Sequence, residues 1–266
     1  MNGEIYNRKV LCDIAHCAFE VINRLLSRDQ LLARETRSAT THSRQIYREE
    51  CITVEMAATL RERFPGQVEI TLFTPPEETR TGADWYWRFE SGKRAIHARV
   101  QAKRVQRTEF SQDDSHGHVD IDLPQLTQLL QATSAATDQL SGLQAWLATY
   151  ARFHATPPCG YNNLTQCIQH QHQEACENHE PSLWIAKAQE IEQIARPQMP
   201  VRNVIQNSVR LDCMLPCITG LDAAPGPATK GFTLQTGLQT YQECIEIIER
   251  DVLLRSEFEG ALRIAV

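Results

Sequence analysis

Apolar residues recur at helical spacing in the first part of the chain. Between 8 and 34 they fall at every third or fourth position, and the polar stretch RETRSATTHS that follows offers no apolar face. This spacing predicts a helix over 8–34 and, after a loop, a second helix over about 45–63 that FPG ends. The second helix contains three glutamates, Glu49, Glu50 and Glu55.

The next part of the chain alternates between apolar and polar positions, as strands do. QVEITLF over 67–73 predicts a first strand, and TPPEETRTG breaks it with two prolines and several turn-forming residues. ADWYWRFE over 83–90 and RAIHARVQAKRV over 94–105 predict two more strands, and the SGK between them suits a hairpin turn. The predicted order is helix, strand, strand, strand.

The rest of the chain is predicted to be mostly helical. Helices are expected over 123–136, 138–155 and 181–195, where apolar residues fall on one face. Residues 203–218 fit either a strand or a short helix, and a long closing helix is expected over 238–262.

The pattern favours an α/β protein with a small mixed sheet flanked by helices. It divides the chain into three parts: a helical N-terminal extension at 1–40, an α/β core at 41–165, and a mostly helical C-terminal region at 166–266 packed on that core.

Composition is that of an ordinary globular protein. Hydrophobic residues make up 42% of the 266 residues, enough to bury a core, and charged residues make up 23%. No apolar run reaches the roughly 18 residues of a membrane span, and the first residues lack the pattern of a signal peptide. We therefore expect a cytoplasmic protein without a membrane partner, with its nine cysteines reduced.

Charge is unevenly distributed. A net charge of −6 argues against indiscriminate nucleic-acid binding, yet seven basic residues and one acid lie between 88 and 107. Such a run is either a solvated face or a phosphate-binding stripe. Six of its members are predicted to contact phosphates: Arg88, Lys93, Arg94, Arg99, Arg104 and Arg107.

Three polar residues of the predicted hairpin suggest chemistry. Gln101 and Lys103 are two apart and share one face of their strand, whereas Val100, Ala102 and Arg104 take the other. Asp84 begins the strand that folds back beside them. A carboxylate, an amide oxygen and an ammonium are therefore expected to converge.

This combination fits phosphodiester hydrolysis with a hard cation. Asp84, Gln101 and the carbonyl of Ala102 are oxygen ligands of the kind Mg²⁺ prefers. Lys103 would activate the attacking water or neutralise charge that develops on the phosphate. A carboxylate from the preceding helix, Glu50 or Glu55, would complete the site.

These residues resemble the PD-(D/E)XK nuclease superfamily, in the variant where Gln replaces the second acid. More narrowly, GADWYW followed by VQAKR is similar to a bacterial domain family with GADWEWW, VQAK and an EExxT helix start, which here reads Glu49 to Thr53 and favours Glu50. The resemblance implies a restriction-endonuclease-like core and a Mg²⁺- or Mn²⁺-dependent nuclease. Its substrate would be DNA rather than RNA, in bacterial defence or restriction, and a homodimer or a partner protein in a larger complex fits that role.

Other interpretations remain open. The same fold could bind nucleic acid or a partner protein without cutting, and Asp84 and Lys103 could be a turn cap and an edge-strand charge. Trp85, Tyr86 and Trp87 suit cross-strand packing or base stacking. Cysteines and histidines between 154 and 179, and the pair Cys213 and Cys217, could hold zinc, although their spacings match no short-loop zinc pattern.

Overall fold

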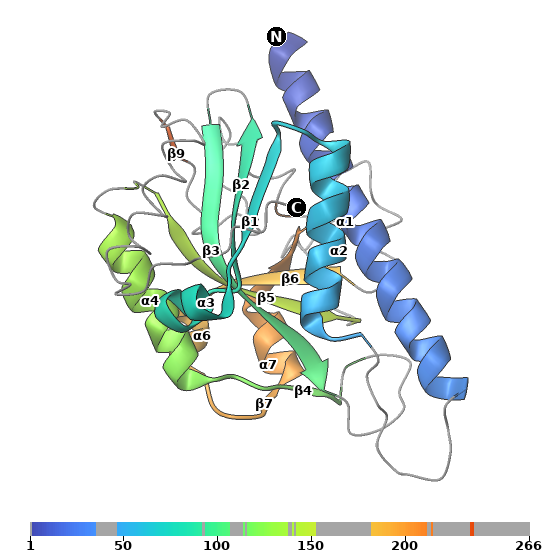
Figure 1. Cartoon of the computed structure of the whole chain (residues 1–266), viewed down its shortest axis with the longest axis vertical. Coiled ribbons are helices and arrows are strands. Elements are labelled where there is room, and N and C mark those ends of the chain that lie inside the picture. The colour runs from blue at the N-terminus through green and yellow to red at the C-terminus, as the bar shows by residue number, and fades with distance from the viewer. Residues whose placement is uncertain are drawn as a thin grey trace.

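The computed structural model describes residues 2–35, 47–91, 94–106, 114, 116–137, 140, 142–152, 182–211, 214 and 235–236. Its helices are α1 (Asn2–Glu35), α2 (Glu49–Arg63), α3 (Pro75–Thr81), α4 (Leu123–Thr137), α6 (Ala188–Glu192) and α7 (Val201–Gln206). Its strands are β1 (Val68–Leu72), β2 (Trp85–Ser91), β3 (Arg94–Gln106), β4 (His118–Val119), β5 (Gln144–Ala151), β6 (Ser182–Lys187), β7 (Met199–Pro200), β8 (Ser208–Arg210) and β9 (Gln235–Thr236). Figure 1 shows their arrangement.

A mixed sheet with the strand order β1-β2-β3-β5-β6-β8 forms the centre of the molecule. β1, β2 and β3 are antiparallel neighbours, β5 runs parallel to β3, and β6 and β8 continue antiparallel. A parallel neighbour requires a crossover connection, and α4 supplies it between β3 and β5. The predicted fold class, a mixed sheet flanked by helices, is confirmed.

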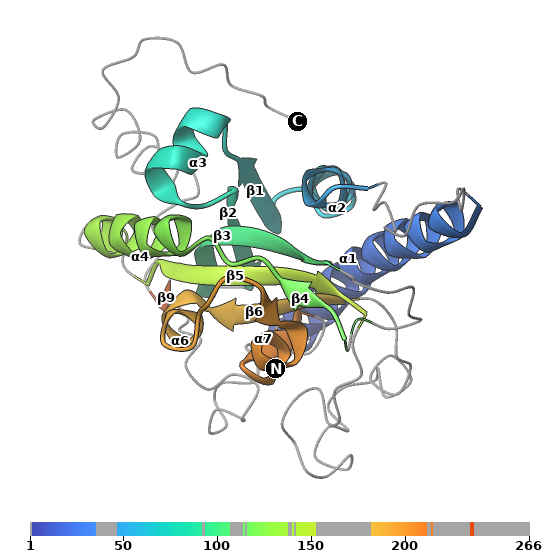
Figure 2. The ribbon, with the colours of Figure 1, turned by 90° about the horizontal axis from the view of Figure 1, so that it is seen from below.

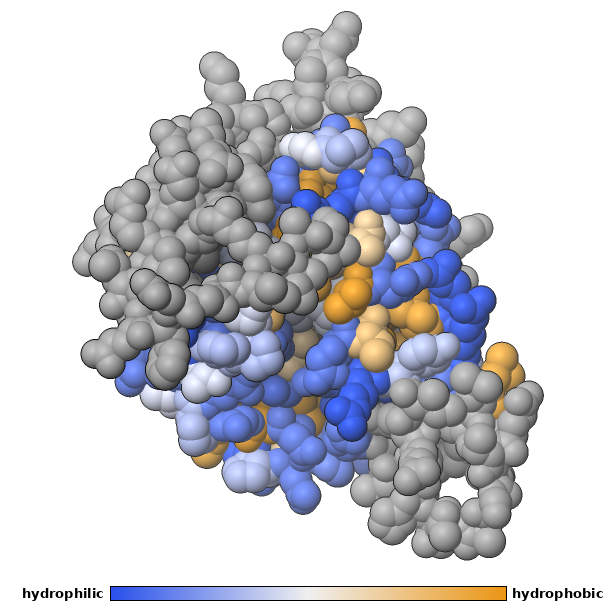
Figure 3. Space-filling model, viewed as in Figure 1, coloured by the Kyte–Doolittle hydropathy of each residue, from blue (hydrophilic) through white to orange (hydrophobic). Residues whose placement is uncertain are grey.

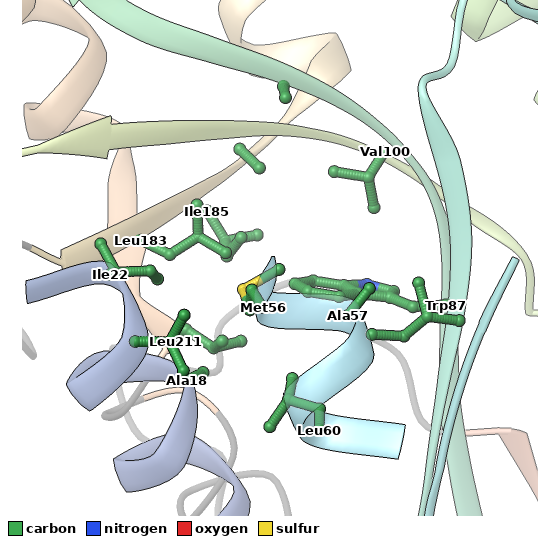
Figure 4. Close-up of a cluster of buried hydrophobic side chains, with 14 of the residues drawn as sticks. Ala18, Ile22, Met56, Ala57, Leu60, Trp87, Val100, Leu183, Ile185 and Leu211 are labelled. Atoms are coloured by element: carbon green, nitrogen blue, oxygen red, sulfur yellow. The ribbon is translucent and has the colours of Figure 1, made fainter. Parts of the chain in front are cut away.

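Helices cover both faces of the sheet (Figure 2). On one face α1 and α2 pack over a core in which Met56, Trp87 and Ile185 are completely buried, as Figure 4 shows. On the other face α4, α6 and α7 enclose a second core around Leu129 and Leu147. Because α1 contacts both α2 and β6, the predicted N-terminal extension is part of the sheet's cover.

Two predicted helices are strands. The stretch 144–151 forms β5 and the stretch 182–187 forms β6, and every residue of each except one end residue is buried. The helix expected over 181–195 is therefore limited to α6, so the region after 166 contributes strands as well as helices. A strand or a short helix was expected over 203–218, and the described part of this stretch contains the end of α7 and the whole of β8. The closing helix expected over 238–262 lies outside the described residues.

The proline-rich break after β1 is a helix. Thr74 caps α3, its hydroxyl and backbone N–H both bonding the Glu77 carboxylate, and prolines occupy the first turn, where their missing N–H costs nothing. The prediction of a simple turn here is wrong. The consequence for function is that α3 places Glu78 beside the end of β1.

Candidate active site

One cavity of about 410 Å³ collects acidic residues from three separate elements. The first turn of α2 supplies Glu49 and Glu50, α3 supplies Glu78, and the residue before β2 supplies Asp84. Ala102 of β3 also lines the cavity. The structure therefore brings together three of the predicted metal-binding residues, Glu50, Asp84 and Ala102, and adds two glutamates.

The backbone fixes Asp84 between β1 and β3. Its N–H donates to the carbonyl of Val100 (2.8 Å) and its carbonyl accepts from the N–H of Phe73 (2.9 Å). Its carboxylate accepts a further hydrogen bond from the N–H of Ala102. Gly82, two residues earlier, ends α3 with φ 68°, and a side chain there would overlap the backbone of α4. The glycine of GADW therefore lets α4 approach the acid closely.

A residue of α4 connects Asp84 with Lys103. The ammonium of Lys103 donates to the side-chain oxygen of Gln125 (3.3 Å), and the Gln125 side chain also hydrogen-bonds the Asp84 carboxyl group. The predicted acid and lysine are thus joined through one amide. The sequence does not single out Gln125, because one of several glutamines in a helix has no distinguishing spacing.

Three carboxyl groups around the cavity, those of Glu49, Glu78 and Asp84, have raised pKa values. Burial raises the pKa of Glu49 to about 7, with repulsion from Asp84 and Glu50 adding to the effect and Lys103 opposing it. Burial, with Glu50 adding, raises the pKa of Asp84 to about 6. Burial and the same acids also raise the pKa of Glu78. One ammonium does not offset this much negative charge, so a bound cation would be stabilised here.

A second, more polar cavity of about 360 Å³ shares Glu49 and Glu50 with the first. Arg48 and Lys103 bring positive charge to it, and Asp120 brings one more carboxylate. The two cavities therefore adjoin the first turn of α2. One is rich in carboxylates, and the other offers cationic groups that an anionic chain could contact.

The donor set fits a hard divalent cation. Within the described part of the chain, no three His, Cys, Asp or Glu side chains form a metal-binding group. Mg²⁺, however, commonly uses one or two carboxylates and keeps several waters. Asp84 and Glu50 line the same cavity and carry oxygen donors within a cluster of acidic residues, which is compatible with that lower requirement.

Gln101 occupies a different position from the one expected. It shares a strand face with Lys103, as predicted, and this face turns towards α4, whereas Val100 and Ala102 join the core under α1 and α2. Its side chain is completely buried, and neither amide atom has a hydrogen-bond partner within the described structure. It lines neither cavity. Asp84 and Lys103 therefore lie together at the cavities, whereas the Gln101 amide lies in the interior, away from both cavities.

A family profile matches residues 14–252, which is most of the chain, including both cavities and the whole described sheet. The chain belongs to DUF6615, a family of unknown function. Among curated proteins no significant match is found. Within the described residues, no helix of this DUF6615 protein combines the length and apolarity needed to cross a membrane.

The prediction that the basic residues between 88 and 107 of this DUF6615 chain contact phosphates is wrong at three positions. Arg88, Arg99 and Arg104 are at most 6% exposed. The guanidinium of Arg99 donates to a backbone carbonyl of α4 (2.7 Å), and that of Arg104 binds Asp29 of α1 and the carbonyl of Tyr47. Strands covered on both faces bury their side chains on both faces. Lys93, Arg107 and the side chain of Arg94 lie outside the described residues.

The structure also bears on three alternatives left open by the sequence: the acid that α2 contributes, the role of the hairpin aromatics, and the candidate zinc ligands. Glu55 forms an ion pair with Arg24 of α1 (2.8 Å) and does not line the cavity, so Glu49 and Glu50 are the acids that α2 contributes. The three hairpin aromatics, Trp85, Tyr86 and Trp87, are completely buried, which confirms that they pack in the interior. The candidate zinc ligands between 154 and 179, and Cys213 and Cys217, lie outside the described residues.

Proposed function

We propose that this DUF6615 protein is a metal-dependent nuclease that hydrolyses phosphodiester bonds of DNA. One observation carries the proposal: Asp84 and Lys103, joined through Gln125, stand beside a cavity lined by three further carboxylates. An acid, a lysine and spare oxygen ligands are the groups that such hydrolysis requires.

The order of elements supports the same proposal. The PD-(D/E)XK resemblance implies a helix, three strands with the acid and lysine on the hairpin, and a further helix. α2, β1, β2, β3 and α4 follow that order, with α3 inserted between β1 and β2 and the short β4 between β3 and α4. β5, from a stretch predicted to be helical, adds to the sheet beside β3. A role in bacterial defence or restriction stays a prediction from the resemblance alone.

The residues of the site would have different roles in the reaction. Mg²⁺ or Mn²⁺ held by Asp84 and Glu50 would supply a bound water of lowered pKa and polarise a phosphoryl oxygen. The N–H of Ala102 orients the Asp84 carboxylate, and Gln125 keeps the Lys103 ammonium beside it. Lys103 would then offset the negative charge that grows on the phosphate in the transition state.

Replacement of Lys103 by Ala is the direct test of this proposal. We expect purified protein to cut plasmid or single-stranded DNA only with Mg²⁺ or Mn²⁺, and the variant to cut about 10²–10³-fold more slowly. Lys187→Ala is the matched control, because Lys187 pairs with Glu190 and lines neither cavity. DNA binding without cutting by either protein would instead favour a catalytically silent binding module.

The pH profile offers a second check. Glu49 and Asp84, with pKa values of about 7 and about 6, take up protons as the pH falls and lose the charge that holds a cation. We expect the cutting rate to rise from about pH 5.5 to about pH 7.5. Because a cation competes with protons for these groups, a higher Mg²⁺ concentration should move the profile to lower pH. A profile that is flat and insensitive to Mg²⁺ would contradict this role for the acids.

A further inference from the structure

We propose that the larger cavity holds one unpaired nucleobase next to the bond being cut, so that the substrate is single-stranded DNA or a nucleotide turned out of its duplex. The inference rests on the proposed nuclease function and specifies its substrate. It starts from the composition of the cavity, in which the carboxylates form one part of the lining and apolar groups form the rest.

The apolar part of the lining comes from α2 and from the segment that joins β1 to α3. Val54 projects from α2, and Leu72, Phe73 and Pro75 follow one another from the end of β1 into α3. Val54 is 44% exposed, which makes it one of four large apolar side chains exposed within the described structure. Figure 3 shows apolar residues over α2 bordered by hydrophilic ones, together with smaller apolar areas elsewhere on the same face. Apolar groups left open beside a charged cluster indicate a ligand with an apolar part.

The size and the chemistry of the cavity both favour a nucleobase as its occupant. A volume of about 410 Å³ falls within the range of small-molecule sites, and a base in its stacked, paired position cannot enter such a space. An occupant must also present an anionic group to the cation site. A nucleotide unit meets both conditions, because its phosphate and its flat apolar ring are adjacent.

The hydroxyl groups on the lining are already engaged. Thr53 donates to the carbonyl of Glu49 and shares a hydrogen bond with Tyr150 (2.8 Å), and Thr74 bonds Glu77. The apolar part therefore offers surface for stacking more than hydrogen bonds for reading a base edge. We expect the four bases to be accepted with similar affinity.

The neighbouring polar cavity extends this path. It shares Glu49 and Glu50 with the first cavity and contains Arg48 and Lys103, which suit the phosphates on one side of the bound nucleotide. A single strand can follow both cavities around the start of α2. A duplex would first have to release a base, and this step weakens its binding.

The test measures binding in a protein that cuts slowly. In the Lys103→Ala background with Mg²⁺ present, fluorescence anisotropy would compare a labelled single-stranded oligonucleotide with the same sequence as a duplex. We expect the single strand to bind at least about tenfold more tightly, and Val54→Gln to reduce its affinity about tenfold. Ile194→Gln is the matched control, since Ile194 is 42% exposed and lines neither cavity. Circular dichroism would verify that both variants fold.

The outcomes separate the two proposals. Lys103-dependent cutting with equal affinity for both DNA forms, or with equal effects of Val54→Gln and Ile194→Gln, would overturn the base-binding inference and leave the nuclease intact. No binding of either DNA form, with no cutting by the unaltered protein, would overturn both. A strand preference that only Val54→Gln weakens would support the inference.

Discussion

Asp84→Asn is expected to lose metal-dependent cutting and, at pH 8, to fold more stably than the unaltered protein. The loss of activity should be about 10³-fold or more, because a cation ligand contributes several kcal/mol to the transition state. Asparagine keeps an oxygen that can accept the hydrogen bond from the N–H of Ala102. The substitution therefore removes charge while it preserves the local backbone.

The gain in stability follows from the raised pKa of Asp84. The folded protein raises it from 3.8 to about 6, so folding favours the protonated form of this group. As the pH rises from about 4 to above about 6, the unfolded chain ionises first, and the folded state becomes less stable relative to it. Removal of the charge should increase the free energy of unfolding by on the order of 1–3 kcal/mol at pH 8 and change it little near pH 4.

Thermal unfolding at several pH values would measure this effect. Added Mg²⁺ should raise the melting temperature of the unaltered protein, because binding to the folded state stabilises it, and should do so far less for Asp84→Asn. Asp13→Asn, at an exposed position of α1 that lines neither cavity, should change neither quantity. A destabilised Asp84→Asn protein at pH 8 would mean that the acid serves the fold and not a cation site.

The sequence predicts the elements in which apolar and polar residues recur with a regular period. β1, β2 and β3 alternate in this way, although several polar residues of β2 and β3 are buried too, and α1, α2 and α4 place their apolar residues on one face, so all six are recognisable. β5 and β6 are central strands covered on both faces, and their nearly continuous apolar runs do not alternate. Periodicity alone does not distinguish such a run from a buried helix, which is why both were predicted as helices.

In the candidate site, too, some residues could be predicted from local sequence patterns and others could not. Spacing along the hairpin placed Asp84 and Lys103 near one another, and the glutamates of α2 were expected to join them. Glu78 was missed because two prolines were interpreted as a break, although the TPPE of 74–77 has the S/T-x-x-E pattern of a capping box. Gln125 depends on how α4 crosses the sheet, and local sequence does not contain that information.

The basic residues between 88 and 107 show a different limit of prediction from sequence. A run of arginines on strands was interpreted as a surface, because charged side chains are rarely buried unless paired. Arg99 and Arg104 are exceptions whose partners, the backbone of α4 and Asp29 of α1, are distant in the sequence. Only the packing of helices on both faces of the sheet makes their burial evident.

Arg104→Met is therefore expected to destabilise the fold and not to weaken DNA binding specifically. The guanidinium of Arg104 and the carboxylate of Asp29 are at least 93% buried and paired, and loss of one partner leaves a buried charge without compensation. We expect the free energy of unfolding to fall by about 3–5 kcal/mol, measured by urea denaturation. The double variant Asp29→Leu/Arg104→Met should recover most of this loss, because it removes both charges and fills the space with apolar groups. An Arg104→Met protein of unchanged stability and reduced DNA affinity would restore this arginine to the phosphate-binding surface and contradict its role in fixing α1 to β3.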